Sequence, residues 1–400
     1  MRTNVSFGSE RERPASEERA RAGTALAAAG CDFALLSSPE NVTYVSGYEV
    51  PVQFGAHTEL SYGLPLALCA ARDSASWLIV SNGAAGAAAE QAPSMNVLTF
   101  GGFDGFEATD FRACYLDAIA NALHQAGLNH ASATLGIEAR ALPYAVSDML
   151  ATRFPRLKLV EAEPALRQAR LIKTDREITL LRRASALSDI AHNALATLIQ
   201  AAGRNEIDMW AEISRNIFQA AGRDIPLSGE LVTGPRSTVV AYPNGPRDRI
   251  TETGDAALMD LSGRYNGYWF DCTNTHVVGG VEPTTEQRRF AKASQGACEA
   301  AMAALKPGAL ACDASAAAEH AFAKHGLPMA HYTGHQIGVT VNELPRLVPY
   351  DRTPIEPGMV FSVEPGAYQG PDGSFGARSE KMVLVTATGP EILSTFNWGV

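Results

Sequence analysis

The segment at 256–278 constrains the fold of this chain more than any other. It is AALMDLSGRYNGYWFDCTNTHVV, two β-type runs on either side of Asn266-Gly267. Asn-Gly is the pair that most favours a two-residue hairpin turn, because both residues tolerate the positive φ of a type I′ turn. We therefore predict a β-hairpin with its turn at these two residues.

The same turn fixes which residues face each other across the hairpin. It pairs Tyr265 with Tyr268, and further along it pairs Asp260 with Thr273 and Ser262 with Asp271. Because side chains alternate with a period of two, Asp260, Ser262, Asp271 and Thr273 share one face. The two aspartates are diagonal neighbours, roughly 7 Å apart at the backbone.

The hairpin alone leaves two interpretations open. Apolar neighbours such as Leu258, Trp269 and Phe270 indicate burial, and two buried carboxylates repel each other unless a cation or a proton intervenes. The simpler alternative is a hairpin edge on which one or both aspartates face water. Segments near the end of the chain favour the buried pair of carboxylates.

Two glutamates and a histidine extend the set. In MVFSVEP, Glu364 ends an apolar strand, and in GARSEKMVLVT, Glu380 heads another, with Arg378 expected on the same face and beside its carboxylate. In HYTGHQIG, glycines flank His335 in an expected loop and allow close backbone approach. A histidine in such a loop is often only structural.

Asp260, Asp271, His335, Glu364 and Glu380 together form an oxygen-rich set without thiolates. Such a set suits two divalent cations bridged by carboxylates, which would activate water for hydrolysis. Mn, Co and Fe fit this ligand chemistry at least as well as Zn, so the residues leave the metal open, with Mn as our expectation.

The order D-x(10)-D, G-H-x-x-G, E-P-G and R-x-E closely resembles the pita-bread metallohydrolases, the family of aminopeptidase P, prolidase, methionine aminopeptidase and creatinase. The resemblance implies that the five residues above are the metal ligands. The segments at 166–184 and 35–49 are similar to the opening helix of the catalytic domain and to the N-domain of the aminopeptidase P and creatinase branch. The resemblance implies a creatinase-like α/β N-terminal domain at 1–162 and an α+β pita-bread catalytic domain at 163–400.

This chain departs from the family pattern at two positions. The peptidases usually carry histidines where Asn244 and Asn342 stand here, and the resemblance gives both positions to substrate binding. Asparagine still donates a hydrogen bond but does not titrate near neutral pH. His331 matches a third family histidine and is retained.

The resemblance implies an Xaa-Pro aminopeptidase or dipeptidase in which Glu364 accepts a proton while His331 and Arg378 orient the substrate, as catalytic residues. The two asparagines keep an alternative open: a hydrolase of a small amide of the ectoine or creatine type, or a dimethylsulfoniopropionate-type lyase. A catalytically silent binding protein is a third hypothesis. The expected partner is a short peptide or a small molecule.

The N-terminal half alternates short apolar strands with alanine-rich helical stretches, which is typical of an α/β domain. Its segment at 51–64 contains His57 and Tyr62, and by resemblance one or the other reaches the active site of a partner subunit in a homodimer. A surface loop is the alternative for this segment.

Charge and composition exclude several other classes. The net charge of −10, without a basic stripe, argues against nucleic acid as a partner. We find no secretory signal or membrane span and expect a cytoplasmic protein. The six widely spaced cysteines predict reduced thiols rather than a disulfide scaffold.

Overall fold

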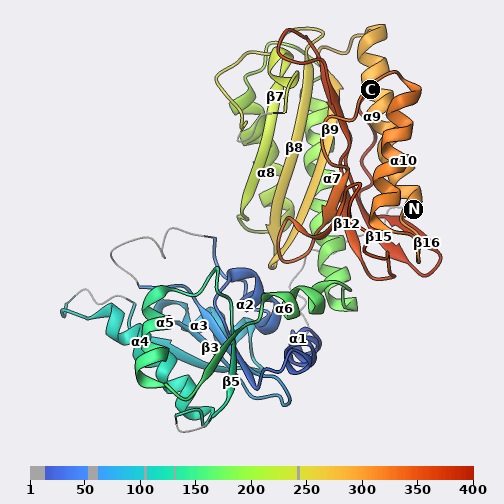
Figure 1. The fold of residues 1–400 in the computed structure, drawn as a ribbon. Helices are drawn as coiled ribbons and strands as arrows, with labels where there is room; N and C mark the ends of the chain where they lie inside the picture. Colours follow the sequence, from blue (N-terminus) through green and yellow to red (C-terminus); the bar gives the residue numbers. More distant parts are fainter. Residues whose placement is uncertain (1–13, 53–61, 103–105, 130–131, 241–243) are drawn as a thin grey trace. The chain divides into compact units, whose positions relative to one another are not determined.

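The computed structural model describes residues 14–52, 62–102, 106–129, 132–240 and 244–400. These residues divide into two compact units, one ending at Thr174 and the other running from Asp175 to Val400 (Figure 1). Among the described residues, no helix combines the length and the apolar character needed to cross a lipid bilayer. All six cysteines are free thiols, as predicted from their spacing.

The first unit is an α/β domain, as predicted. Its helices are α1 (Ser16–Ala28), α2 (Pro39–Ser46), α3 (Ala85–Gln91), α4 (Phe111–Gln125), α5 (Tyr144–Arg153) and α6 (Glu163–Arg170). Its strands are β1 (Phe33–Leu36), β2 (Leu66–Ala70), β3 (Ser76–Ser81), β4 (Asn96–Phe100), β5 (Thr134–Ile137) and β6 (Lys158–Glu161).

The six strands form one mixed sheet in the order β4-β3-β2-β1-β5-β6. Alternate residues of the central strands, such as Leu35, Leu68 and Ile79, pack with α4 and α5 in a single hydrophobic cluster. This cluster is the core of the unit, because burying one face of a sheet under helices removes the most apolar area from water.

Helix α6 belongs to the first unit. Arg170 donates to Asn41 Oδ1 over 2.6 Å, and Tyr44 donates to the carbonyl of Ala169 over 2.9 Å. The boundary between the compact units therefore lies after Thr174, later than the boundary at 162/163 expected from the sequence. The amphipathic pattern of α6 predicts a helix but not the partner against which it packs.

The second unit is α+β, as predicted. Its helices are α7 (Asp175–Leu198), α8 (Glu206–Ala221), α9 (Thr285–Ala304) and α10 (Ala311–Lys324). Its strands are β7 (Leu227–Thr233), β8 (Ala256–Tyr265), β9 (Tyr268–Val277), β10 (Gly334–Gln336), β11 (Glu343–Leu347), β12 (Val360–Val363), β13 (Gly366–Tyr368), β14 (Gly376–Arg378), β15 (Lys381–Thr386) and β16 (Gly389–Ile392).

These strands form three sheets, ordered β7-β8-β9, β11-β10-β12-β15-β16 and β13-β14. Helices α7 and α8 contact the long strands of the first sheet, while α9 and α10 lie side by side and contact strands of the other two sheets (Figure 1). Strand β9 contacts both β14 and β15, so the three sheets meet along it.

The predicted hairpin is confirmed with its register. Asn266 and Gly267 have φ values of 51° and 83°, as a type I′ turn requires. Strands β8 and β9 pair Tyr265 with Tyr268, Ser262 with Asp271 and Asp260 with Thr273. Both aspartates therefore project from the same face of a largely buried ribbon.

Two expectations about the later strands are wrong. His335 lies in β10, a strand of the five-stranded sheet, rather than in a loop. A Cβ atom at Gly334 would lie 2.2 Å from the carbonyl oxygen of Ser362, so the glycine is needed to let this strand approach β12. Glu380 directly precedes β15, as expected, but Arg378 lies on β14 in a different sheet, because the chain leaves one sheet at Ser379 and Glu380 and joins the next, so alternation does not relate the two side chains.

Candidate metal centre

Five strands and their ends bring the five predicted ligands to one place in the second unit. Asp260 lies on β8, Asp271 on β9 and His335 on β10, while Glu364 follows β12 and Glu380 precedes β15. Backbone contacts join these strands across sheet boundaries. Glu380 N donates to the carbonyl of Thr273 over 2.9 Å, and Ser362 Oγ donates to the carbonyl of Asp271 over 3.0 Å.

The ligand atoms lie close together. Atoms of Asp271, His335 and Glu380 are all within 4.8 Å of one another, and all three residues are buried. His335 Nε2 is 3.6 Å from Asp271 Oδ2 and 3.3 Å from Glu364 Oε1. The other ring nitrogen, Nδ1, is 2.9 Å from the carbonyl of Gln336, which assigns it the proton and leaves Nε2 to face the carboxylates in the neutral ring.

A shared pattern runs through three of the carboxylates. Ser262 donates to Asp271 Oδ1 over 2.8 Å, Thr273 donates to Glu380 Oε2 over 2.7 Å, and Arg378 donates to Asp260 Oδ2 over 2.7 Å. One oxygen of each carboxylate is thus oriented by the protein.

The second oxygens of two of them have no such partner. Asp260 Oδ1 and Glu380 Oε1 are buried, and no described group donates a hydrogen bond to either. A buried acceptor without a partner costs free energy, typically 1–3 kcal/mol or more when it is charged. Unpartnered oxygens that face other acids fit divalent cations, which prefer carboxylate and imidazole ligands.

The pKa values of these side chains also show that several negative charges lie close together. Burial, followed by the charge of Asp271, raises the pKa of Glu380 well above its usual range, and burial also raises that of Asp260 despite the opposing charge of Arg378. Burial alone would lower the pKa of His335, but its hydrogen bonds to Asp271 and Glu364 raise it to about 10. Without a cation, the site thus takes up protons to reduce its negative charge.

Glu364 behaves differently from the other glutamate. Burial acts to raise its pKa, but the hydrogen bond and charge of His335 outweigh burial and lower it. Glu364 therefore stays ionised more readily than Glu380, which suits the predicted role of proton acceptor.

Arg378 contacts Asp260 rather than Glu380, contrary to the expectation from strand alternation. Its guanidinium forms buried ion pairs with Asp260 and with Glu230 on β7. It reaches Glu380 only through Thr273, whose hydroxyl accepts from Arg378 Nε over 3.2 Å. The alternation fails because the strand breaks between the two residues.

His331 is linked to this network through a tyrosine. Its Nε2 is 3.3 Å from the hydroxyl of Tyr368, and that hydroxyl accepts from Arg378 Nη1 over 2.9 Å. Burial lowers the pKa of His331 more than the nearby charge of Glu364 raises it. A neutral imidazole therefore lies at the edge of the cluster.

The two asparagines have different surroundings. Asn244 is buried, and its Oδ1 accepts from Arg236 over 2.9 Å, while Arg236 also forms an ion pair with the buried Glu206. Asn342 is exposed, and its backbone carbonyl accepts from the hydroxyl of Thr340. Substrate binding by either side chain stays a prediction.

The two substrate residues expected from the first unit gain no support. The ring of Tyr62 packs edge-on against Tyr115, with 5.6 Å between the ring centroids, next to the hydrophobic core. That packing accounts for its partial burial. His57 lies outside the described residues.

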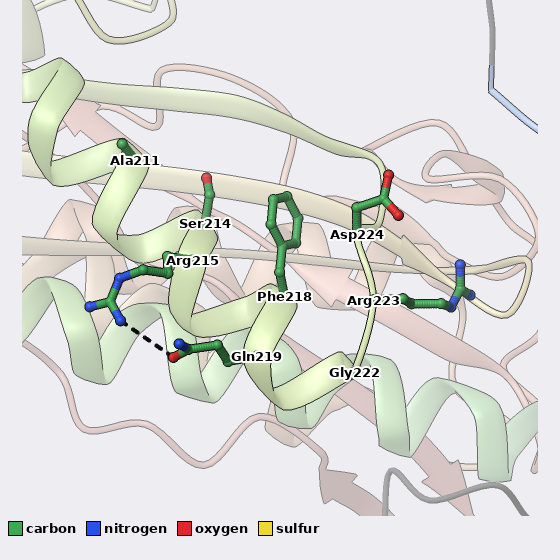
Figure 2. Close-up of a pocket in the computed structure, with 8 residues that line it drawn as sticks. All are labelled: Ala211, Ser214, Arg215, Phe218, Gln219, Gly222, Arg223 and Asp224. Carbon is green, nitrogen blue, oxygen red and sulfur yellow. Dashed lines mark hydrogen bonds between the residues drawn. The ribbon is translucent and has the colours of Figure 1, made fainter.

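A separate pocket of about 720 Å³ lies along α8 and the turn that follows it (Figure 2). Its lining residues are Ala211, Ser214, Arg215, Phe218, Gln219, Gly222, Arg223 and Asp224. None of them is a candidate ligand, and they include no histidine or cysteine. The pocket therefore does not belong to the metal centre.

Sequence comparison supports the assignment of both units. Residues 179–387 match the model of metallopeptidase family M24, and residues 19–172 match the creatinase/prolidase N-terminal domain. The probable dipeptidase PepE of Mycobacterium tuberculosis is 34% identical over 233 residues, which are 58% of this chain and 60% of that protein. The Xaa-Pro dipeptidase of Pyrococcus horikoshii is 31% identical over 265 residues, 65% of this chain and 73% of that protein.

Solved structures share the fold over almost the whole chain. The prolidase from Pyrococcus horikoshii OT3 has a TM-score of 0.75 at 25% identity, covering 96% of this chain and 99% of that one. An Xaa-Pro dipeptidase from Bacillus anthracis has a TM-score of 0.78 at 24% identity, covering 96% and 98%. Because the M24 model matches more than half of the residues, this chain belongs to metallopeptidase family M24.

Proposed function

We propose that this chain is a divalent-metal-dependent hydrolase that cleaves the amide bond of Xaa-Pro dipeptides. The observation that carries this proposal is the cluster of carboxylates around His335, in which buried oxygens of Asp260 and Glu380 lack hydrogen-bond partners. The relatives named as dipeptidases and Xaa-Pro dipeptidases support the substrate class.

Charge balance supports two metal ions. The cluster contains five carboxylates, four of them buried and that of Asp260 partly exposed, and one buried guanidinium, Arg378, which leaves four negative charges when all are ionised. The five carboxylates are those of Glu230, Asp260, Asp271, Glu364 and Glu380. Two divalent ions neutralise them, whereas one leaves the site strongly anionic.

We assign the five predicted ligands to these ions and favour Mn, with Co, Fe and Zn compatible with the same donors. Divalent ions there would lower the pKa of a water molecule and polarise a carbonyl oxygen.

The protein's own groups have distinct roles in this proposal. Glu364, held ionised by His335, accepts a proton, and His331 contacts the substrate at the edge of the cluster. Arg378 acts through its neighbours, because Asp260, Glu230 and Tyr368 already occupy its donors. It orients Asp260 and the tyrosine hydroxyl rather than holding the substrate directly.

The test is an assay of the full chain loaded with Mn²⁺ on a series of Xaa-Pro dipeptides and on a panel of small amides. Asp271→Asn is the matched control, because it keeps the shape of the side chain and removes a ligand charge. We expect turnover of Xaa-Pro dipeptides by the wild type and a loss of at least 10²-fold in the variant. A wild type that cleaves neither class would contradict the proposal.

One observation favours a second candidate function. Arg236 fixes Asn244 Oδ1, so this position offers a neutral, oriented amide where the family peptidases carry a titratable histidine. A small amide of the ectoine or creatine type is then the substrate, or a dimethylsulfoniopropionate-type compound that undergoes elimination. Product analysis in ¹⁸O-labelled water separates these outcomes, because hydrolysis incorporates solvent oxygen and elimination does not.

We also propose a homodimer in the cytoplasm, on the resemblance to the creatinase branch. Sedimentation analysis of the full chain tests the dimer. His57→Ala tests whether the 51–64 segment reaches a substrate, with a raised KM as the expected result.

A further inference from the structure

The segment at 393–399, which follows β16, is held against the second unit by hydrogen bonds and ring contacts with side chains of several elements. Asp189 on α7 accepts hydrogen bonds from Thr395 N over 2.7 Å, from Thr395 Oγ1 over 2.6 Å and from Phe396 N over 3.0 Å. The ring of Phe396 stacks on His192, with 4.1 Å between centroids. We refer to residues 393–399 as the strap.

Asn274 on β9 binds the strap through both the nitrogen and the oxygen of its side-chain amide. Its Nδ2 donates to the carbonyl of Asn397 over 2.9 Å, and its Oδ1 accepts from Gly399 N over 3.1 Å. A Cβ atom at Gly399 would lie 2.3 Å from His276 Nδ1, so only glycine allows this approach. Asn274 directly follows Thr273, whose hydroxyl orients Glu380.

Lys381 provides the second grip. Its buried ammonium donates to the carbonyl of Phe396 and lies 3.1 Å from the centroid of the Phe396 ring and 4.6 Å from that of Trp398. A buried lysine is costly unless such contacts compensate for the loss of water. An apolar side chain at position 381 would also fit in β15. We therefore attribute the presence of a lysine there to its contacts with the strap.

The position of Lys381 links the strap to two candidate ligands. Lys381 directly follows Glu380, and it pairs across the sheet with Val363, the residue before Glu364. The backbone that presents both glutamates is therefore fixed at the point where the strap is gripped.

We propose that the strap positions Glu380 and Glu364 for metal binding, with Asn274 and Lys381 as positioning residues. This inference rests on the metal site of the proposed function. Without the two grips, the ends of β9 and β15 gain freedom, and the ligand oxygens lose the spacing that a cation requires.

The test is titration of the metal-free full chain with Mn²⁺ by calorimetry, together with the thermal midpoint of each metal-free variant. Lys381→Met keeps the length and apolar packing of the side chain, and Asn274→Leu keeps its approximate volume. We expect each to weaken Mn²⁺ binding at least tenfold. Trp398→Leu, at a partly exposed position, removes one aromatic contact of Lys381, and we expect a smaller loss of about threefold.

Arg182→Met is the matched control. It removes an ion pair that ties α7 to Glu391 on β16, close to the strap in sequence but without contact to Asn274 or Lys381. We expect its Mn²⁺ affinity to equal that of the wild type. Rescue of tight binding by Lys381→Arg, which restores a cation to the carbonyl and the rings, supports a positioning role over a general loss of stability.

Three results overturn the proposal. If Lys381→Met or Asn274→Leu fails to fold, Trp398→Leu decides, and an affinity equal to that of Arg182→Met contradicts the strap's role. If the variants fold and all bind Mn²⁺ as the wild type does, the inference is wrong while the metal site stands. A wild type that binds no Mn²⁺ contradicts the proposed function and the inference together.

Discussion

Arg378 and Glu230 form a buried ion pair in which the same guanidinium also holds Asp260, with 2.7 Å between Arg378 Nη2 and Asp260 Oδ2. Glu230 is hydrogen-bonded to the arginine and is not a candidate ligand. Its charge offsets that of Arg378, so the arginine orients Asp260 without neutralising it fully. This balance leaves Asp260 with charge available for a cation.

Glu230→Ala tests that balance. Removing Glu230 takes away a buried, charge-assisted hydrogen bond of Arg378, whose charge stays compensated by Asp260, so we expect the free energy of unfolding to fall by about 2 kcal/mol. Arg378 then pairs with Asp260 alone and competes with Mn²⁺ for it, which weakens metal binding. Urea denaturation and Mn²⁺ titration measure the two effects.

Glu282→Ala is the control for that variant, because it removes an exposed pair with Arg288. We expect a change of at most about 0.5 kcal/mol. A loss in Glu230→Ala no larger than in this control would show that the buried pair contributes little.

We predict that Glu380→Gln makes the metal-free protein more stable than the wild type and the Mn²⁺-loaded protein less stable. Burial and the neighbouring acids raise the pKa of Glu380 in the folded chain. The metal-free protein therefore loses stability as the pH rises above the pKa of an unfolded glutamate. Glutamine still accepts from Thr273 but carries no charge, so at pH 8 in EDTA we expect the variant to be about 1 kcal/mol more stable than the wild type.

With saturating Mn²⁺ the order should reverse, because only the wild type gains the free energy of binding. Thermal unfolding in both conditions makes the comparison, with Glu356→Gln at an exposed position as the control. A variant less stable than the wild type in EDTA at every pH would contradict the crowding of charge at this site.

Asn244→Asp tests the NH₂ group of the Asn244 side chain separately from its oxygen. Aspartate keeps the oxygen that accepts from Arg236 and lacks the NH₂ donor. If that donor binds substrate, KM should rise about tenfold while the thermal midpoint stays within a few degrees of the wild type. Asn216→Asp on α8 is the matched control, since its amide donates to the carbonyl of Glu212 on its own helix. Unchanged KM in Asn244→Asp would remove this residue from the substrate site.

His276 predicts sensitivity to acid. Burial lowers its pKa to about 4, and its Nε2 has no hydrogen-bond partner among the described groups. The unfolded chain binds the proton more tightly, so stability is lost as the pH falls from about 6.5 toward 4. From the two pKa values, we expect a loss of about 2 kcal/mol between pH 7 and pH 5 from this residue.

The variant His276→Gln should lack this loss of stability between pH 7 and pH 5. Urea denaturation in EDTA at both pH values gives the difference between variant and wild type, which cancels the contribution of the carboxylates. A difference that does not change with pH would show that His276 is not buried as a neutral ring.

Local chemistry in the sequence predicts the parts of the site that depend on a turn or a motif. Asn266-Gly267 defines the hairpin register and thereby the shared face of Asp260 and Asp271, which the structure confirms. Of the five positions, Asp271, His335, Glu364 and Glu380 lie close together, and Asp260 shares the hairpin face of Asp271. Their role in binding metal stays a prediction until an ion is seen.

Features that depend on distant pairing were not predictable in this way. Glu230 meets Arg378 because β7 pairs with β8 so that Glu230 faces Asp260, and a long connection rather than a tight turn sets that register. The only sequence signal is an acidic residue within the strand run LSGELVT. The strand break before Glu380 has no glycine or proline to announce it, so alternation across 376–386 placed Arg378 beside the wrong carboxylate.

A crystal structure of the full chain grown with Mn²⁺ and without chelator, with anomalous scattering data, tests the central claim most directly. The account predicts two anomalous peaks, each about 2.0–2.4 Å from ligand atoms of Asp260, Asp271, His335, Glu364 and Glu380. Absence of anomalous density among these side chains, with Mn²⁺ in excess, would contradict it.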